Sequence, residues 1–347
     1  MELLKSGQSF MIGSMPHKRA DDAFAVLEEF PLDIQTWPQL PARSFVEGMI
    51  PQCSEGFPGI EIDAEGKSIR LMRGDDLLES MTKAYEAVLA EDRDFFSISG
   101  EFAEGLHRFL ELNGNRDPLP VVKGQITGPF TFGLGLNDAE GRAIWWDDSY
   151  RDLIYAGLAL KGTWQVEKLK DVADVVLMFC DEPILSALGT PAYMGVRNEE
   201  VVEGLNRVID PLKTTGAIVG MHCCGNMDWA VTTRANLDVI SFDAYEFGDK
   251  STIYAAEISN FLERGGYLAW GIVPTGDTDA VARETVDSLL EKMNRLIKLF
   301  CNAGIDGDLL RKRSLYTPSC GVGSLSEDAA ARVFELLAGL KSRLEWE

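Results

Sequence analysis

The sequence predicts an α/β protein built as a (β/α)8 TIM barrel, a single domain spanning residues 1–347 with a long N-terminal insertion or lid. From residue 119 onward, apolar runs alternate with helical patterns, and runs that are apolar throughout are typical of parallel strands covered on both faces. No linker or low-complexity stretch interrupts this series. A length of 347 residues also suits one large barrel core.

The N-terminal third is expected to hold about two strand-helix units and an irregular insertion. Residues 9–16 predict a short buried strand that ends in a Gly-Ser-Met-Pro turn, and residues 20–30 show a helical pattern. A second strand is predicted at 34–38, followed by prolines and glycines that indicate a long loop or lid up to about residue 60. Residues 75–112 are mostly helical in pattern, with a break near 97–100.

Six further strands and two long helices are predicted after residue 118. The strands are expected at 119–126, 175–180, 217–222, 239–243, 267–273 and 314–318, and the helices at 149–172 and 198–213. Together with the N-terminal units these strands suggest a barrel of eight. A doubly wound sheet would also place ligands at the carboxyl ends of its strands, so the pattern favours an enzyme more firmly than it favours the barrel.

The composition disfavours nucleic acid and anionic membranes as partners. The chain has 33 basic and 55 acidic residues, a formal net charge of -22, and no window rich in Lys and Arg. No apolar run approaches the roughly 20 residues that span a bilayer, and the first residues lack a hydrophobic signal core. A cytoplasmic protein is therefore expected. Its six cysteines are interpreted as reduced thiols and ligands rather than a disulfide framework.

The stretch 221–226, Met-His-Cys-Cys-Gly-Asn, is the strongest signal for a metal site. It continues an apolar run, and in a strand the side chains of His222 and Cys224 project to one face while Cys223 projects to the other. This periodicity favours Cys224 over Cys223 as a ligand. Since zinc takes four ligands, the pair is half a site.

Other polar residues also follow predicted strands, where the mouth of a barrel would lie. These positions are Gly13-Ser14, Gln125 to Gly128, Asp181-Glu182-Pro183, Asp243 to Glu246, and Cys320. Asp181 has an alternative interpretation, because Asp followed by Pro can cap the next helix.

Five motifs, in their order along the chain, resemble those of one enzyme superfamily. They are Ile-Gly-Ser-Met-Pro-His at 12–17, Thr-Gly-Pro at 127–129, Asp-Glu-Pro at 181–183, His-x-Cys-Gly-Asn at 222–226 and Pro-Ser-Cys-Gly at 318–321. The chain resembles the superfamily of uroporphyrinogen decarboxylase and cobalamin-independent methionine synthase over essentially its whole length, although residues 35–115 contribute little. Members with His-x-Cys and a later Cys are zinc-dependent thiol methyltransferases.

The resemblance implies roles for individual residues. The zinc ligands would be His222, Cys224 and Cys320, with Glu246, 24 positions after the histidine, as the fourth. Asp243 competes with Glu246 for that place. By the same resemblance Asp181 would bind a substrate amino group, as in homocysteine. Ser14 would lie beside the substrate.

The implied function is a Zn²⁺-dependent methyltransferase that moves a methyl group to a small thiol, homocysteine-like or coenzyme M-like. A methylcorrinoid such as methylcobalamin, carried by a corrinoid protein, is one candidate donor, and a methylated small molecule is another. The sequence lacks the Gly-Glu segment that contributes a further carboxylate to amino-acid binding in methionine synthase, and residues 239–243 look more like the decarboxylase and coenzyme M branch.

Two alternatives remain. One is a uroporphyrinogen decarboxylase-like enzyme, against which the N-terminal region has no Arg-Gln-Ala-Gly-Arg-like segment. The other is a non-catalytic corrinoid- or metal-binding accessory protein.

Overall fold

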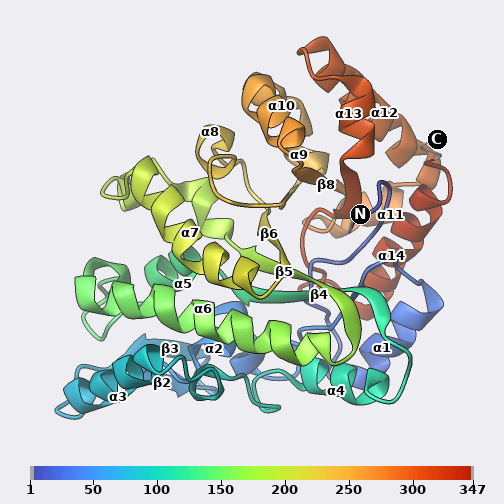
Figure 1. The fold of residues 1–347 in the computed structure, drawn as a ribbon. Helices are drawn as coiled ribbons and strands as arrows, with labels where there is room; N and C mark the ends of the chain where they lie inside the picture. Colours follow the sequence, from blue (N-terminus) through green and yellow to red (C-terminus); the bar gives the residue numbers. More distant parts are fainter. Residues whose placement is uncertain (1–3, 345–347) are drawn as a thin grey trace.

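A curved parallel sheet of seven strands forms the centre of the molecule in the computed structural model, which describes residues 4–344 (Figure 1). The strand order is β1-β4-β5-β6-β7-β8-β9, and every neighbouring pair is parallel. The strands are β1 (Gln35–Thr36), β4 (Leu119–Thr127), β5 (Ala173–Asp181), β6 (Ile218–Cys223), β7 (Val239–Phe242), β8 (Tyr267–Val273) and β9 (Ser314–Pro318). The α/β prediction and the six strands after residue 118 are confirmed.

Helices cover the outer face of this sheet (Figure 1). The α-helices are α1 (Ala20–Glu29), α2 (Met49–Ser54), α3 (Leu77–Leu89), α4 (Glu104–Asn113), α5 (Pro129–Gly135), α6 (Asp148–Lys170), α7 (Asn198–Thr214), α8 (Trp229–Thr232), α9 (Ala244–Ser251), α10 (Ala255–Glu263), α11 (Thr278–Arg283), α12 (Val286–Asn302), α13 (Gly307–Lys312) and α14 (Glu327–Lys341). Short 3-10 turns are η1 (Phe45–Glu47), η2 (Asp94–Phe96), η3 (Ile144–Trp146), η4 (Pro183–Ala187), η5 (Pro191–Tyr193) and η6 (Thr252–Tyr254). None of the helices within residues 4–344 is long and apolar enough to cross a bilayer.

The gap between β9 and β1 is bridged by an extended N-terminal segment rather than by an eighth strand. Its backbone bonds on one side to β9, where Phe10 N donates to Tyr316 O (3.1 Å), and on the other side to the chain after β1, where Met15 N donates to Gln39 O (2.8 Å). Only isolated bridges form at these contacts. Residues 9–16 therefore form isolated bridges rather than the regular strand that the sequence predicted. The curved seven-stranded sheet is consistent with the predicted TIM-like barrel but is not closed: it is a half-barrel with a bridged opening.

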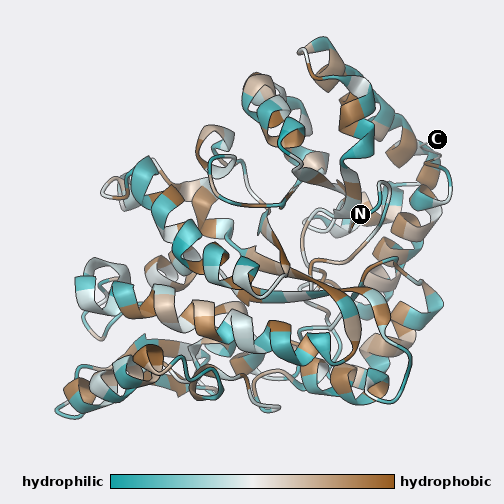
Figure 2. Ribbon diagram, viewed as in Figure 1, coloured by the Kyte–Doolittle hydropathy of each residue, from teal (hydrophilic) through white to brown (hydrophobic). Residues whose placement is uncertain are grey.

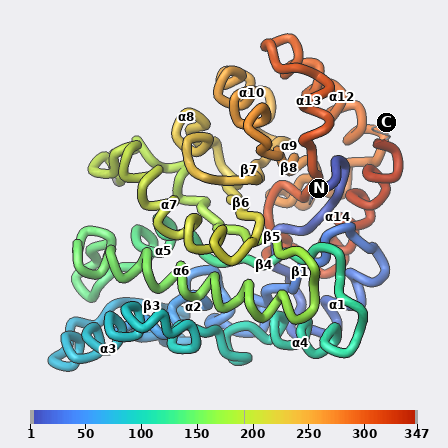
Figure 3. The backbone as a smooth tube through the Cα atoms, viewed as in Figure 1, coloured from blue at the N-terminus to red at the C-terminus, as the bar shows by residue number. Residues whose placement is uncertain are grey.

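Side chains explain why this segment forms no continuous ladder. The carbonyl of Ile12 accepts a hydrogen bond from Lys123 Nζ (2.5 Å), and Ser9 N donates to the carboxylate of Asp33 (2.8 Å). Backbone groups with side-chain partners are unavailable for pairing with a neighbouring strand. The tube drawing in Figure 3 shows the dark-blue N-terminal segment passing the red C-terminal part of the chain at this place.

Two apolar cores lie on the two faces of the sheet. Inside its curve, one small cluster joins residues from the N-terminal segment and most of the strands, among them Phe10, Phe179 and Leu315. The larger core lies between the outer face of the sheet and the helices. Figure 2 shows the result, with brown central strands and helices whose teal faces turn outward. Because the central strands β5 to β8 are buried on both faces, most of their residues are apolar, as is typical of a parallel sheet.

Residues between β1 and β4 form the insertion, which is more ordered than a loop. Besides α2, α3 and α4 it contains an antiparallel hairpin, β2 (Ile60–Asp63) and β3 (Ser68–Leu71), that the sequence did not predict. Each strand of the hairpin is four residues long and alternates exposed polar residues with half-buried or buried apolar ones, a pattern too short to stand out in the sequence. In Figures 1 and 3 it lies with α3 along α6. A lid function stays a prediction, and so does the single-domain assignment.

A buried lysine fixes the insertion to the barrel. Lys161 of α6 has no exposed surface, and its ammonium donates hydrogen bonds to the carbonyls of Glu55 (2.9 Å), Phe96 (2.8 Å) and Ser97 (3.2 Å). Three donors on one ammonium therefore satisfy three carbonyls of the insertion that face α6.

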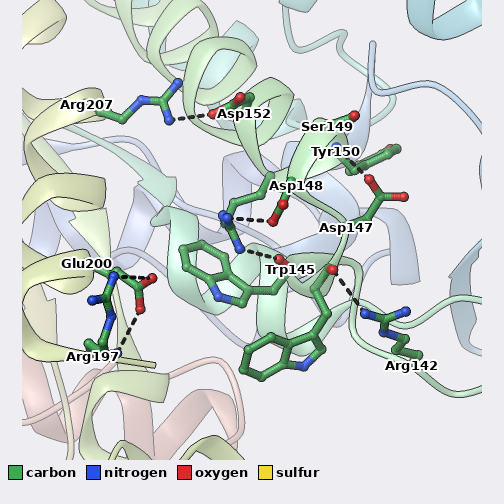
Figure 4. A network of polar contacts seen from close by, with 12 residues as sticks. Arg142, Trp145, Asp147, Asp148, Ser149, Tyr150, Asp152, Arg197, Glu200 and Arg207 are labelled. Atoms are coloured by element: carbon green, nitrogen blue, oxygen red, sulfur yellow. Dashed lines mark hydrogen bonds and ion pairs between the residues drawn. The ribbon is translucent and has the colours of Figure 1, made fainter. Parts of the chain in front are cut away.

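Polar contacts fix the start of α6 at the rim of the sheet (Figure 4). Asp147 caps the helix by accepting a hydrogen bond from Tyr150 N (3.2 Å). Arg207 of α7 pairs with Asp152 (2.6 Å), which ties the two helices together. The ring of Trp145 packs beneath Arg151, whose guanidinium lies 5.4 Å from the ring centroid.

Replacing the buried ammonium should loosen the insertion. We expect Lys161→Met to lower the free energy of unfolding by about 3 kcal/mol, because it removes the donor from three carbonyls, that of the buried Phe96 among them. Urea unfolding followed by circular dichroism measures the change. Lys168→Met, at an exposed position of the same helix, is the control. Equal stability of the two variants would contradict the anchoring role.

A buried carboxyl in the insertion predicts a pH dependence. Burial raises the pKa of Glu47 to about 7, against 4.5 for the ordinary side chain, although Leu40 N and Arg43 donate to it. Between those values the folded state holds a proton that the unfolded chain has lost, so this contribution to stability is complete below 4.5 and is lost as the pH rises through about 7.

Glu47→Gln stays uncharged at every pH, so its stability relative to wild type should rise between about pH 5 and about pH 8. Urea midpoints of both proteins across this range test the expectation. A difference that does not vary with pH would refute it.

Candidate metal centre

Three predicted ligands meet at the carboxyl edge of the sheet. His222 lies near the end of β6, Cys224 follows that strand, and Cys320 follows β9. One ligand atom from each residue lies within 4.8 Å of the others, and within residues 4–344 this is the only such group of three or more His, Cys, Asp or Glu side chains. The structure thus brings together residues nearly a hundred positions apart in the sequence.

The two adjacent cysteines point in opposite directions, as the strand periodicity predicted. Cys223 is fully buried in the outer core between sheet and helices, and its thiol lies 3.8 Å from the carbonyl of Gly225. Cys224 is half-buried and belongs to the group with His222. Cys223 is therefore a core residue.

The two nitrogens of His222 have different surroundings. The ring is 3% exposed, and Nδ1 lies 3.0 Å from Ser241 Oγ of the neighbouring strand. Nε2 is buried and has no hydrogen-bond partner in the described residues. A buried polar atom without a partner is costly, so Nε2 is the nitrogen that needs a ligand.

The thiols favour one negative charge even without a metal. A hydrogen bond from the Cys320 thiol, together with the neighbouring His222, lowers the pKa of Cys224 to about 4. The thiolate of Cys224, together with burial, raises the pKa of Cys320. A Zn²⁺ ion favours thiolates and a neutral imidazole, and its ordinary bond lengths put tetrahedral ligand atoms about 3.5–3.8 Å apart. The three side chains fit this ion in chemistry, and their ligand atoms already lie within 4.8 Å of one another.

Ser14 lies against the loop that carries Cys320. Its carbonyl accepts a hydrogen bond from Val322 N (2.9 Å), and its hydroxyl accepts one from Gly323 N (3.3 Å). Any side chain at Gly321 would collide with the Ser14 hydroxyl. In this structure Ser14 therefore positions the Cys320 loop, and its predicted contact with substrate stays a prediction.

Asp181 lies at the end of β5, beside the metal group. It is the register partner of His222 on the adjacent strand, and its side chain is 9% exposed. Its Oδ1 is buried and has no hydrogen-bond partner in the described residues. Burial raises its pKa, while the charges of Lys123 and His222 oppose this shift.

Lys123 is a buried cation inside the barrel that the sequence did not single out. Its ammonium donates to Ile12 O (2.5 Å) and Gln125 Oε1 (3.0 Å) and lies 4.8 Å from the centroid of the Phe179 ring. Burial lowers its pKa to about 8, and the charge of Asp181 opposes that shift. The two charges thus stabilise each other in the interior. The side-chain oxygen of Gln125 accepts the hydrogen bond from Lys123, and its side-chain nitrogen donates to Trp37 O (3.3 Å).

The neighbouring carboxylate has a structural task. Glu182 is fully buried and accepts hydrogen bonds from Phe130 N (2.8 Å), Thr131 N (2.8 Å) and Thr131 Oγ1 (2.6 Å) at the start of α5. The sequence left open whether Asp181 caps the helix that follows it. In the structure Glu182 has the capping role instead, and the helix that it caps is α5, which precedes it in the chain. Asp181 is left free to face the site.

The structure does not bring Glu246 to the other predicted ligands. It is exposed in the first turn of α9, and its backbone N–H donates to Asp243 (2.8 Å). Asp243 caps this helix and is 7% exposed, and burial raises its pKa to about 7. Because α9 begins at Ala244, the helix turns residue 246 outward. Ligation by Glu246 stays a prediction.

Comparison with known proteins shows which solved structures share this fold. A B12-independent methionine synthase from Shewanella sp. W3-18-1, solved with selenomethionine, is 13% identical, with 98% of each chain covered and a TM-score of 0.57. A protein from Listeria monocytogenes, provisionally assigned as a vitamin-B12-independent methionine synthase, is 14% identical over 95% of this chain and 86% of its own, with a TM-score of 0.58.

A methyltransferase from Methanosarcina mazei is 13% identical over 96% of this chain and 92% of its own, with a TM-score of 0.51. No protein-family model matches the sequence, and no curated protein sequence matches it significantly. The chain therefore has the fold that its motifs implied.

Zinc binding should depend on Cys224 and Cys320 but not on the cysteine between them. We expect the purified protein to hold one Zn²⁺ per chain, and Cys224→Ala and Cys320→Ala to lose most of it on dialysis, because each removes a thiolate ligand. Elemental analysis measures the stoichiometry. Cys223→Ala is the matched control and should keep its zinc; loss from this variant alone would contradict the assignment.

Proposed function

We propose that this protein is a zinc-dependent methyltransferase that moves a methyl group to a small thiol. The observation that supports it best is the donor set: a buried imidazole nitrogen without a partner and two thiols, one of them favouring the thiolate, at the carboxyl edge of the sheet. Active sites of barrel enzymes lie at this edge. The shared fold with methionine synthases and a methyltransferase agrees with the proposal.

A bound Zn²⁺ would lower the pKa of a substrate thiol, so that it reacts as a thiolate at neutral pH. His222, Cys224 and Cys320 would hold this ion. The two cysteine thiolates offset its charge, so that the substrate sulfur would keep electron density for the reaction. In the transfer a sulfur lone pair forms the S–CH3 bond, the donor keeps the electron pair of the bond that breaks, and the thiol proton leaves to solvent.

Asp181 supports a substrate that carries an ammonium group. Its unpartnered Oδ1 requires a donor, and an ammonium can supply both the hydrogen bond and the opposite charge. A sulfonate on the substrate, as in coenzyme M, would instead face a carboxylate. The site thus favours an amino thiol of the homocysteine type over a coenzyme M-like thiol.

The methyl donor is proposed from the motifs alone. A methylcorrinoid, presented by a corrinoid protein, is one candidate and a methylated small molecule is the other. Assays of the zinc-loaded protein with methylcobalamin and with small methyl donors, each combined with homocysteine, cysteine and coenzyme M, test the proposal by mass spectrometry of the methylated thiol. Formation of a zinc- and protein-dependent S-methyl product supports it. Absence of product in every combination, or decarboxylation of a porphyrinogen by the metal-free protein, would overturn it.

Asp181 should discriminate between thiols with and without an amino group. We expect Asp181→Asn to reduce kcat/KM for homocysteine about 10- to 100-fold, as loss of a charged hydrogen bond of about 1.5–3 kcal/mol requires. The same variant should change the rate with a thiol that lacks the amino group much less. Asp174→Asn, at the exposed start of the same strand, is the control. Equal losses with both kinds of thiol would argue against ammonium recognition.

A further inference from the structure

The hydroxyl of Ser241 has one hydrogen-bond contact in the described part of the chain, to the imidazole of His222. Ser241 lies on β7 as the register partner of His222 on β6, so both side chains face the same interior. It is fully buried, and its Oγ lies 3.0 Å from Nδ1. The contact therefore follows from strand pairing and not from a mobile loop.

A neutral imidazole carries its proton on one nitrogen and a lone pair on the other. If Nδ1 donates its proton to Ser241, Nε2 presents a lone pair. If Ser241 donates to Nδ1 instead, Nε2 carries the proton and cannot bind a cation. Nε2 is the buried atom without a partner, so only the first arrangement satisfies both nitrogens when a metal is bound.

We propose that Ser241 is a positioning residue that accepts the Nδ1 proton of His222 and so holds the imidazole in the tautomer that offers Nε2 to the metal. This inference rests on the metal site of the proposed function. A hydroxyl can accept the Nδ1 proton without adding charge, whereas a carboxylate at this place would add a further negative charge beside two thiolates. A neutral partner therefore suits a site whose two thiolates already balance a divalent ion.

Chelator competition and histidine NMR test the proposal together. Ser241→Ala should weaken zinc binding about 10- to 100-fold, the usual effect of losing the outer partner of a ligating histidine, and Ser241→Thr should restore it. Ser314→Ala is the matched control: Ser314 is a buried strand serine that accepts a ring N–H, from Trp270 (2.9 Å), outside the metal group. It should keep wild-type zinc affinity even if the protein becomes less stable.

The tautomer itself is visible in ¹⁵N-histidine spectra, which are simple because the chain has three histidines. In the zinc-loaded wild type, His222 should carry its proton on Nδ1. Wild-type zinc affinity in Ser241→Ala would overturn the inference while leaving zinc binding in place. A proton on Nε2 of His222 in the wild type would overturn it as well, and that result does not depend on whether the variant folds. A wild type that binds no zinc would instead refute the proposed function.

Discussion

The structure depends on one constraint: polar groups buried inside a parallel sheet must find partners. Lys123 donates hydrogen bonds to the carbonyl of Ile12 and to the side-chain oxygen of Gln125. Glu182 accepts hydrogen bonds from the first turn of α5. Two buried atoms at the carboxyl edge of the sheet have no hydrogen-bond partner within the described residues: Nε2 of His222 and Oδ1 of Asp181. They lie at adjacent positions on paired strands, and they are the atoms at which we propose that a metal and a substrate cation bind.

The same constraint shapes the fold around the site. The ammonium of Lys123 takes a carbonyl from the N-terminal segment, which then bridges the sheet without becoming a regular strand. That segment continues to Ser14, which fixes the loop of Cys320. The opening of the half-barrel and the position of Cys320 thus have connected causes. The buried ammonium of Lys123 thus helps to position the loop that carries Cys320.

Much of this arrangement could be predicted from local pattern. Side-chain alternation along a strand predicted Cys224 rather than Cys223 as the ligand, and the motif resemblance predicted Cys320. Features that depend on distant contacts could not be predicted: the irregular segment at 9–16 results from Lys123, more than a hundred residues away, and Ser241 pairs with His222 only through the register of two strands. Glu246 was predicted as a ligand from its spacing of 24 positions after the histidine, but α9 begins at Ala244 and leaves the side chain of residue 246 exposed.

X-ray absorption at the zinc edge tests the central claim most directly. The zinc-loaded protein should show one nitrogen and two sulfur ligands from the chain, with Zn–S distances of about 2.3 Å, and addition of an amino thiol should add a third sulfur. A shell without sulfur, or one that does not change when the thiol is added, would contradict an account in which His222, Cys224 and Cys320 hold a metal that activates a thiol.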